Sequence, residues 1–160
     1  MAKRLVICEK PSVARAVAIG LGVKSKSGTW ENGEWIIAAA SGHLLEALEP
    51  DQLDPSLTVW RIEDLPILPK RLKFQPAGDR AAKRLGELHN LIGRDDVVGI
   101  VNACDAAREG ELIFKQILCH APVGTTKPVW RAWFSSLTYG AIRHAFANLQ
   151  IRRASCKERV

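Results

Sequence analysis

The fold is decided by the stretch Val97-Val98-Gly99-Ile100-Val101-Asn102-Ala103-Cys104-Asp105-Ala106-Ala107-Arg108-Glu109-Gly110-Glu111, in which an apolar run ends in a group of acidic residues. A continuous Val/Ile run is typical of a central strand in a parallel sheet. Open α/β sheets bind their ligands beyond the carboxyl ends of such strands. We therefore expect Asp105 at that edge of a sheet, with a helix opened by Glu109 and continuing through residues 112–119.

The acidic residues allow two interpretations. Asp105, Glu109 and Glu111 repel one another within a few residues unless a cation relieves the repulsion, which favours a metal site. Alternatively, they complement the positive end of the helix dipole, worth ~0.3–1 kcal/mol each. The dipole interpretation explains the two glutamates better than the aspartate at the strand end.

The composition indicates one globular domain of cytoplasmic type. The chain has 160 residues, of which 47% are hydrophobic, enough for a sizeable core. No apolar run approaches the roughly 20 residues of a membrane span, and no signal peptide is recognisable, so we expect no membrane partner. The cysteines are scattered without a C-x-x-C pair and are expected to be buried small hydrophobes rather than zinc ligands or disulfides: Cys8, Cys104, Cys119 and Cys156.

The formal net charge of +6 favours a polyanionic partner. Many of the basic residues fall within one segment: Lys70, Arg71, Lys73, Arg80, Lys83, Arg84 and Arg94. A solvated charged face and a nucleic-acid surface explain this segment about equally well. The acidic group inside a basic protein favours nucleic acid together with a divalent cation, because phosphate and metal would then share one site.

The order of elements predicts two α/β units joined by a hairpin. Residues 4–8 form a strand, and a helix follows over 13–21 with Ser12 as its N-cap. Glu9 thus follows a strand as Asp105 does, and we expect the two side chains to lie close together. Asn32-Gly33 predicts a β-hairpin. Residues 41–76 form a long irregular excursion, followed by a helix (80–92), the Val97 strand, a short strand (129–133) and a helix (139–149) with Thr138 as its N-cap.

Four blocks in this order resemble the Toprim domain of type IA DNA topoisomerases, most closely the topoisomerase III branch. They are Leu5-Val6-Ile7-Cys8-Glu9-Lys10-Pro11-Ser12, Gly42-His43-Leu44-Leu45-Glu46, Asp105-Ala106-Ala107-Arg108-Glu109-Gly110-Glu111 and Arg131-Ala132-Trp133-Phe134-Ser135-Ser136-Leu137-Thr138. The resemblance implies an α/β fold, a Toprim-like open sheet with central parallel strands, flanking helices and an inserted β-hairpin. We expect a Toprim domain over residues 1–150 and a basic, disordered tail over 151–160.

The resemblance also implies an activity, DNA strand cleavage and religation by an isomerase, with Mg²⁺ as cofactor and single-stranded DNA as partner. Glu9 matches the glutamate that handles a proton at the scissile phosphate, Lys10 the lysine that stabilises charge there, and Arg131 an arginine near the DNA backbone. The implied metal ligands are Glu9, Asp105 and Glu109; the implied DNA-binding residues are Lys10, Arg108, Arg131 and Ser135.

Two departures from the family pattern change these expectations. Ala107 stands where the family has a second aspartate, and a methyl group cannot coordinate a metal, so we expect weaker Mg²⁺ binding than at an intact site. The family's nucleophilic tyrosine belongs to a domain downstream, and the one tyrosine here, Tyr139, is expected to be a surface or packing residue. We therefore expect a truncated gene product that does not relax DNA alone, with a separate chain as a candidate source of the remaining domains.

Two alternatives stay open. The chain could be a small Toprim nuclease or nucleotidyl-transfer enzyme that uses a metal and water, or a non-catalytic remnant that binds DNA without a metal. Of the remaining candidates, His43 is expected to be a hydrogen-bonded turn residue, and Trp60 is a candidate DNA contact within the irregular excursion.

Overall fold

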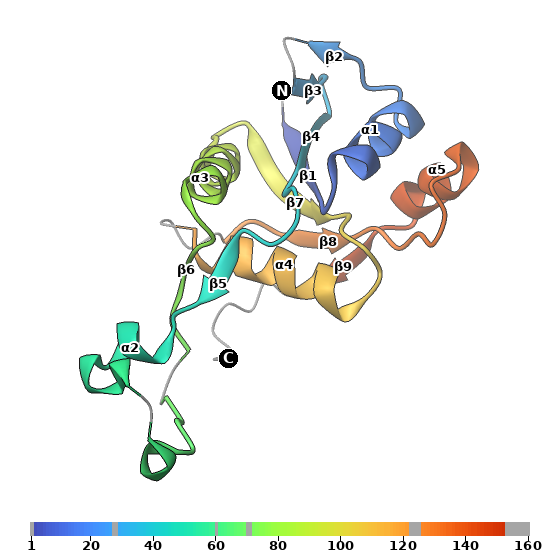
Figure 1. The fold of residues 1–160 in the computed structure, drawn as a ribbon. Helices are drawn as coiled ribbons and strands as arrows, with labels where there is room; N and C mark the ends of the chain where they lie inside the picture. Colours follow the sequence, from blue (N-terminus) through green and yellow to red (C-terminus); the bar gives the residue numbers. More distant parts are fainter. Residues whose placement is uncertain (1, 27–28, 60, 70–71, 122–125, 153–160) are drawn as a thin grey trace.

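The computed structural model describes residues 2–26, 29–59, 61–69, 72–121 and 126–152 (Figure 1). Its strands are β1 (Lys3–Cys8), β2 (Ser25–Lys26), β3 (Thr29–Glu31), β4 (Trp35–Ala39), β5 (Leu45–Ala47), β6 (Phe74–Pro76), β7 (Val97–Asn102), β8 (Val129–Arg131) and β9 (Gln150–Arg152). Its helices are α1 (Pro11–Gly20), α2 (Pro50–Leu53), α3 (Asp79–Gly93), α4 (Arg108–Cys119) and α5 (Tyr139–Ala147), with short 3₁₀ turns η1 (Pro55–Thr58) and η2 (Ile62–Asp64).

The main sheet has the strand order β2-β3-β4-β1-β7-β8-β9. Its central strands β4, β1, β7 and β8 are parallel, whereas the outer strands β2, β3 and β9 pair antiparallel. The predicted hairpin around Asn32-Gly33 is the β3–β4 pair, and the Asn32 side chain accepts hydrogen bonds from the backbone N–H groups of Glu34 and Trp35. The predicted α/β class with central parallel strands is confirmed.

Helices cover both faces of this sheet. In β1, Leu5 and Ile7 join the core beneath α3 and α4, while Val6 and Cys8 join the core beneath α1 and α5. This alternation is the period-two geometry of a strand buried on both faces. Helix α3 buries a stripe at helical spacing, Ala81, Leu85, Leu88 and Ile92, as the sequence pattern predicted.

The described residues of 48–73, which are 48–59, 61–69 and 72–73, extend away from this body and are called the arm (Figure 1). The strands β5 and β6 pair antiparallel at its base, and α2, η1 and η2 beyond them bury no residue. The arm instead exposes apolar side chains, among them Ile62 at 85% exposure and Leu68 at 80%. The predicted irregular excursion is therefore confirmed, although it also contains a strand pair; Trp60 lies outside the described residues.

Two sequence-based boundaries need correction. The N-cap of α1 is Lys10 rather than Ser12, because Pro11 occupies the first helical position with the backbone angle that a helix requires. The predicted tail began at Ile151. In the structure, Ile151 and Arg152 belong to β9, which pairs with β8 at the edge of the sheet. Residues 153–160 lie outside the described part of the chain. Thr138 is the N-cap of α5, as predicted.

No helix within the described ranges is both long and apolar enough to cross a membrane.

A network of charges fastens β1 to β3 and to the turn before β7. Lys3 Nζ lies 2.6 Å from Glu31 Oε1 and 2.9 Å from Asp96 Oδ2, and Arg94 contacts the same two carboxylates at 2.8 Å. Hydrogen bonds from Arg94 and then Lys3 lower the pKa of both Glu31 and Asp96 below their ordinary values.

This network predicts a pH-dependent contribution to stability. A carboxylate with a lowered pKa in the folded state stabilises the fold above the unfolded pKa of about 4 and loses that contribution as the pH falls toward the folded value. We expect Asp96→Asn to lower the free energy of unfolding at neutral pH and the difference from wild type to shrink below about pH 4. Urea unfolding at several pH values measures this. Asp95→Asn, at an exposed neighbour, is the control and should match wild type throughout; equal deficits for Asp96→Asn at neutral and acid pH would contradict the account.

Candidate active site at the strand ends

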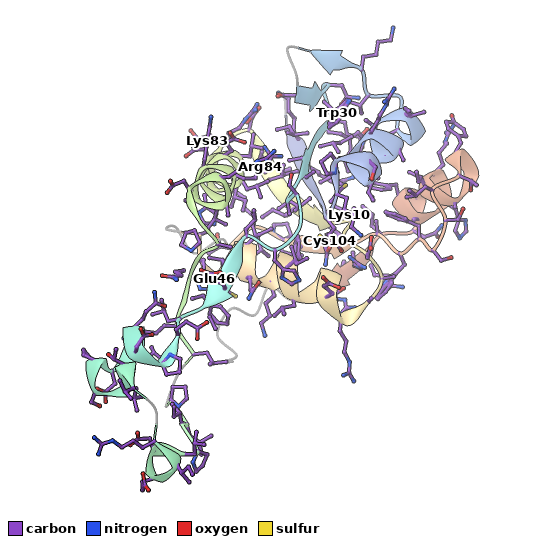
Figure 2. The ribbon with its side chains drawn as sticks, in the orientation of Figure 1. Lys10, Trp30, Glu46, Lys83, Arg84 and Cys104 are labelled. Carbon is purple, nitrogen blue, oxygen red and sulfur yellow. The ribbon has the colours of Figure 1, made fainter. Side chains whose placement is uncertain are left out.

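The parallel pairing of β1 with β7 places the two predicted acidic positions at one edge of the sheet. Ile7 is the register partner of Asn102, and the Ala103 N–H donates to the Ile7 carbonyl over 2.9 Å. Glu9 follows β1 directly, and Asp105 is the third residue after the end of β7. Figure 2 labels Lys10, which lies after β1, and Cys104, which lies after β7.

One ammonium group contacts both carboxylates. Lys10 Nζ lies 3.2 Å from Glu9 Oε1 and 3.7 Å from Asp105 Oδ2. The Glu9 carboxylate, followed by that of Asp105, raises the pKa of Lys10, so the ammonium stays charged. The predicted approach of Glu9 and Asp105 across nearly a hundred residues is thus confirmed.

Glu9 is buried, with 5% of its surface exposed, although it is a charged residue. Its backbone carbonyl accepts hydrogen bonds from the N–H groups of Ser41 and Gly42, which follow β4 in left-handed backbone conformations. Its Oε2 atom is buried and has no hydrogen-bond partner among the described residues. A buried carboxylate oxygen without a partner is costly, so this atom favours a cation or proton donor from outside the described chain.

Glu109 does not join the pair formed by Glu9 and Asp105. Its Oε1 lies 2.9 Å from His43 Nε2, in the segment after β4, and it makes only the smallest contribution to the raised pKa of Lys10. Within the described ranges, no three His, Cys, Asp or Glu side chains are placed to hold a metal ion. The predicted trio of Glu9, Asp105 and Glu109 is therefore not assembled, because Glu109 pairs with His43 and the Lys10 ammonium lies against the other two. His43 is hydrogen-bonded, as expected.

Arg131 has a different place from the one predicted. Its side chain is 0% exposed, so its guanidinium does not reach the surface where a DNA backbone would lie. It donates to Asn102 Oδ1 over 2.6 Å and to the Asp105 carbonyl over 2.9 Å, and its Nε lies 3.2 Å from Glu111 Oε1. Burial lowers the pKa of Arg131, while the Glu111 carboxylate opposes this shift. These contacts make Arg131 a positioning residue for the Asp105 backbone.

The other predicted DNA-binding residues are exposed. Arg108 is the first residue of α4, and Ser135 lies in the loop after β8. Neither side chain makes a hydrogen bond or ion pair with another described residue; both are exposed, and their contact with DNA stays a prediction.

Sequence reasoning missed Asn102. Its buried side chain accepts hydrogen bonds from the Cys104 N–H, over 3.0 Å, and from Arg131. The signal was a polar residue at the end of an apolar strand. The buried thiol of Cys104 lies beside it, and burial raises the pKa of Cys104 to about 12. Cys8 is also buried, as expected, whereas Cys119 is exposed.

Comparison with known proteins agrees with this geometry. The family model for the Toprim domain matches residues 4–137. The chain belongs to the Toprim family. DNA topoisomerase 3 from Staphylococcus aureus, strains USA300 and NCTC 8325, is 43% identical over 149 residues, which cover 92% of this chain and 20% of each relative. The Toprim domain here is thus of the topoisomerase 3 type, and the chain spans about a fifth of the length of these relatives.

The residues at the strand ends fit one Mg²⁺ ion in part. Mg²⁺ in phosphate-handling sites usually takes one or two carboxylates and completes its shell with water and phosphate oxygens. Glu9 offers an unpartnered buried oxygen, and Asp105 offers an exposed carboxylate beside the same lysine. Ala107 offers only a methyl group, so the set is smaller than in the family pattern.

Gly110 permits the close approach of α4 to the Asp105 loop. A Cβ atom at Gly110 would lie 2.8 Å from the Asp105 backbone nitrogen and closer still to its carbonyl oxygen. By contrast, a Cβ atom at Gly86 in α3 would meet nothing within 4 Å.

The two glycines predict opposite effects of the same substitution. Gly86→Ala should stabilise the fold by about 0.5–1 kcal/mol, because alanine is the better helix former. Gly110→Ala should destabilise it by about 1–3 kcal/mol, because the Asp105 backbone must move. Urea unfolding of both variants measures the difference. Stabilisation by Gly110→Ala equal to that by Gly86→Ala would contradict the close contact.

Proposed function

We propose that this chain supplies the metal-binding and phosphate-binding part of a type IA topoisomerase active site. The buried, unpartnered Glu9 Oε2 beside Lys10 and Asp105 is the observation that carries the proposal. Family membership supports it, because the relatives that the chain matches are DNA topoisomerases.

Each side chain at the strand ends has a role in this proposal. Asp105 and Glu9 would hold Mg²⁺. Mg²⁺ supplies positive charge next to the phosphate oxygens at which negative charge develops. Lys10 adds a second positive charge, and Glu9 exchanges a proton with the departing or returning DNA oxygen. Arg131 fixes the Asp105 backbone from behind.

The nucleophile comes from outside these 160 residues in this proposal. Tyr139 lies exposed on α5, where Arg143 donates a hydrogen bond to its hydroxyl over 2.8 Å. We assign Tyr139 no part in strand cleavage. The tyrosine would belong to further sequence of the same protein or to a partner chain, and single-stranded DNA would lie between that tyrosine and Lys10.

The test is binding of a fluorescently labelled single-stranded oligonucleotide, followed by anisotropy with Mg²⁺ and with EDTA. We expect Mg²⁺ to tighten binding by the wild-type chain, because Glu9 and Asp105 would hold the ion and its positive charge would attract a DNA phosphate. Glu9→Gln removes the charge but keeps the side-chain shape, so it should abolish the Mg²⁺ effect. Ala107→Asp restores a carboxylate, so it should strengthen the effect. Glu63→Gln, at an exposed acid on the arm, is the control and should behave as wild type.

Three outcomes separate the candidate functions. Binding that ignores Mg²⁺ in wild type and in Ala107→Asp would contradict the proposal and favour a non-catalytic DNA-binding protein. Metal-dependent nicking of plasmid DNA by the chain alone, lost in Glu9→Gln, would favour the hydrolytic alternative. Equal Mg²⁺ affinity of wild type and Ala107→Asp, measured by calorimetry, would contradict the claim that Ala107 weakens Mg²⁺ binding.

A further inference from the structure

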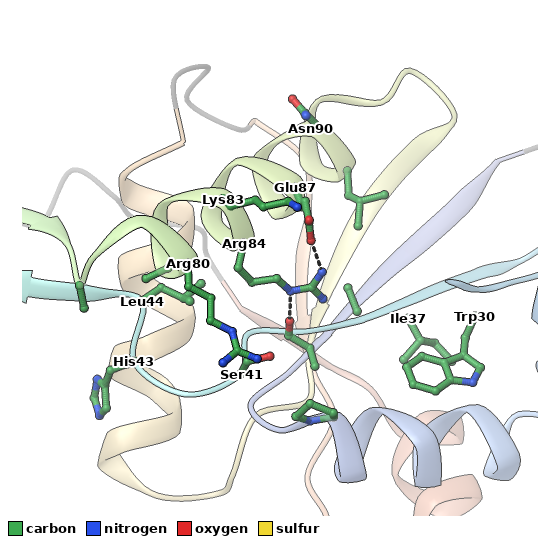
Figure 3. A pocket seen from close by; sticks show the side chains of 16 residues that line it. Trp30, Ile37, Ser41, His43, Leu44, Arg80, Lys83, Arg84, Glu87 and Asn90 are labelled. Atoms are coloured by element: carbon green, nitrogen blue, oxygen red, sulfur yellow. Dashed lines mark hydrogen bonds and ion pairs between the residues drawn. The ribbon is translucent and has the colours of Figure 1, made fainter. Parts of the chain in front are cut away.

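A groove follows the free edge of β4 next to the strand ends. Among the described residues, β3 pairs with β4 at Ile36 and Ile37, and none pairs with Ala38 and Ala39 on that side. The groove along this edge has a volume of about 1050 Å³ (Figure 3). Helix α3 forms one wall, with Arg80, Lys83 and Arg84.

The groove opens at the candidate active site. Pro11 and Ser41 line it. Pro11 follows Lys10 directly in the chain, and the Ser41 N–H donates to the Glu9 carbonyl over 2.8 Å. In Figure 3 Ser41 lies between His43 at one end of the groove and Trp30 at the other. A strand whose phosphate lies at Lys10 could therefore continue into this groove.

The α3 wall carries positive charge that the protein does not compensate. Arg84 donates to the Ala39 carbonyl over 2.7 Å and pairs with Glu87 at 2.5 Å, so these two charges largely cancel. Arg80 and Lys83 are exposed and have no ion pair or hydrogen bond with any residue in the described part of the chain. Two cations facing a groove without a carboxylate partner favour an anionic ligand.

Trp30 gives the groove an aromatic surface. Its indole is half-buried: it packs on the apolar core beneath α1 and α5, on the face of the sheet opposite α3, and the rest of the ring lines the groove at the end away from His43 (Figure 3). No described aromatic ring or cation stacks on it. An aromatic side chain and cations along one groove are a combination that binds single strands, because the ring stacks on a base while the cations contact phosphates.

We propose that the groove between α3 and β4 binds a short single-stranded nucleic-acid segment, with Arg80 and Lys83 at its phosphates and Trp30 against a base. The volume matches this ligand, because it slightly exceeds the roughly 300–1000 Å³ typical of small-molecule pockets and so accommodates more than one nucleotide. The inference deepens the proposed function and rests on it for the direction of the strand. The binding itself needs no metal.

The test uses the full chain and a labelled oligothymidylate of about twelve nucleotides, in EDTA, over a range of salt concentrations. Arg80→Ala and Lys83→Ala should each weaken binding at low salt and reduce the slope of log affinity against log salt by about 0.7, because each removes one phosphate contact. Arg15→Ala removes an exposed cation from α1 and is the control, expected to leave affinity and slope near wild type.

Trp30 is tested separately. Trp30→Ala should weaken binding by about fivefold or more with an unchanged salt slope, because stacking is lost but no phosphate contact. Trp30→Phe should restore most of the affinity. Thymidine monophosphate should compete poorly with the oligonucleotide if the ligand is a strand, whereas equal competition would make the ligand a free nucleotide and overturn the inference.

The failure of this inference differs from the failure of the proposed function. If Arg80→Ala and Lys83→Ala bind the oligonucleotide as Arg15→Ala does, binding in the groove is contradicted, even if Mg²⁺ still tightens binding through Glu9. Weakened binding by both variants in EDTA, with no Mg²⁺ effect in wild type, would support the groove and overturn the metal site. Because Arg80 and Lys83 are exposed, their variants remain informative even if Trp30→Ala does not fold.

Discussion

The parallel pairing of β1 with β7 is the constraint on which the rest of the molecule depends. Both strands are buried on two faces, so a slip in their register would expose apolar side chains or bury polar ones. The pairing of Ile7 with Asn102 fixes where each strand ends, and therefore brings Glu9 next to Asp105. The helices that follow, α1 and α4, then start at the same edge of the sheet. Chemistry at this edge is thus a consequence of core packing.

The acidic stretch after β7 behaves in neither of the two simple ways that its sequence suggested. The three carboxylates neither gather around one point nor merely cap the helix; each has a different cationic or hydrogen-bonding partner from a different element. The pairs are Asp105 with Lys10, Glu109 with His43 and Glu111 with Arg131. Because each carboxylate has its own partner, the repulsion among the three is reduced. Of the three, Asp105 lies beside Glu9, where the two could share a cation.

The sequence predicted the parts of the fold that repeat a strong local pattern. Strand β7 is a continuous apolar run, α3 has one apolar stripe, and the Asn32 side chain makes the hairpin turn that its type favours. The sequence did not predict the features that depend on tertiary contacts. The exposed strand β9 is held by backbone pairing with β8 and by contacts of Gln150 and Arg152 with Trp133, which the sequence pattern does not reveal. Arginine is ordinarily a surface residue, so the sequence did not predict the burial of Arg131. The structure explains it, because Asn102 and Glu111 contact the buried guanidinium.

The central claim is that the turns after β1 and β7 form one cation-binding edge. Addition of Mn²⁺ to the isotopically labelled chain tests it most directly, since carboxylates bind this paramagnetic ion in place of Mg²⁺ and nearby amide signals broaden. The account predicts that the amide signals of Glu9 and Lys10 broaden together with those of Cys104 and Asp105, at the same Mn²⁺ concentration. Broadening of only one of the two turns, or of the exposed arm in preference to both, would contradict it.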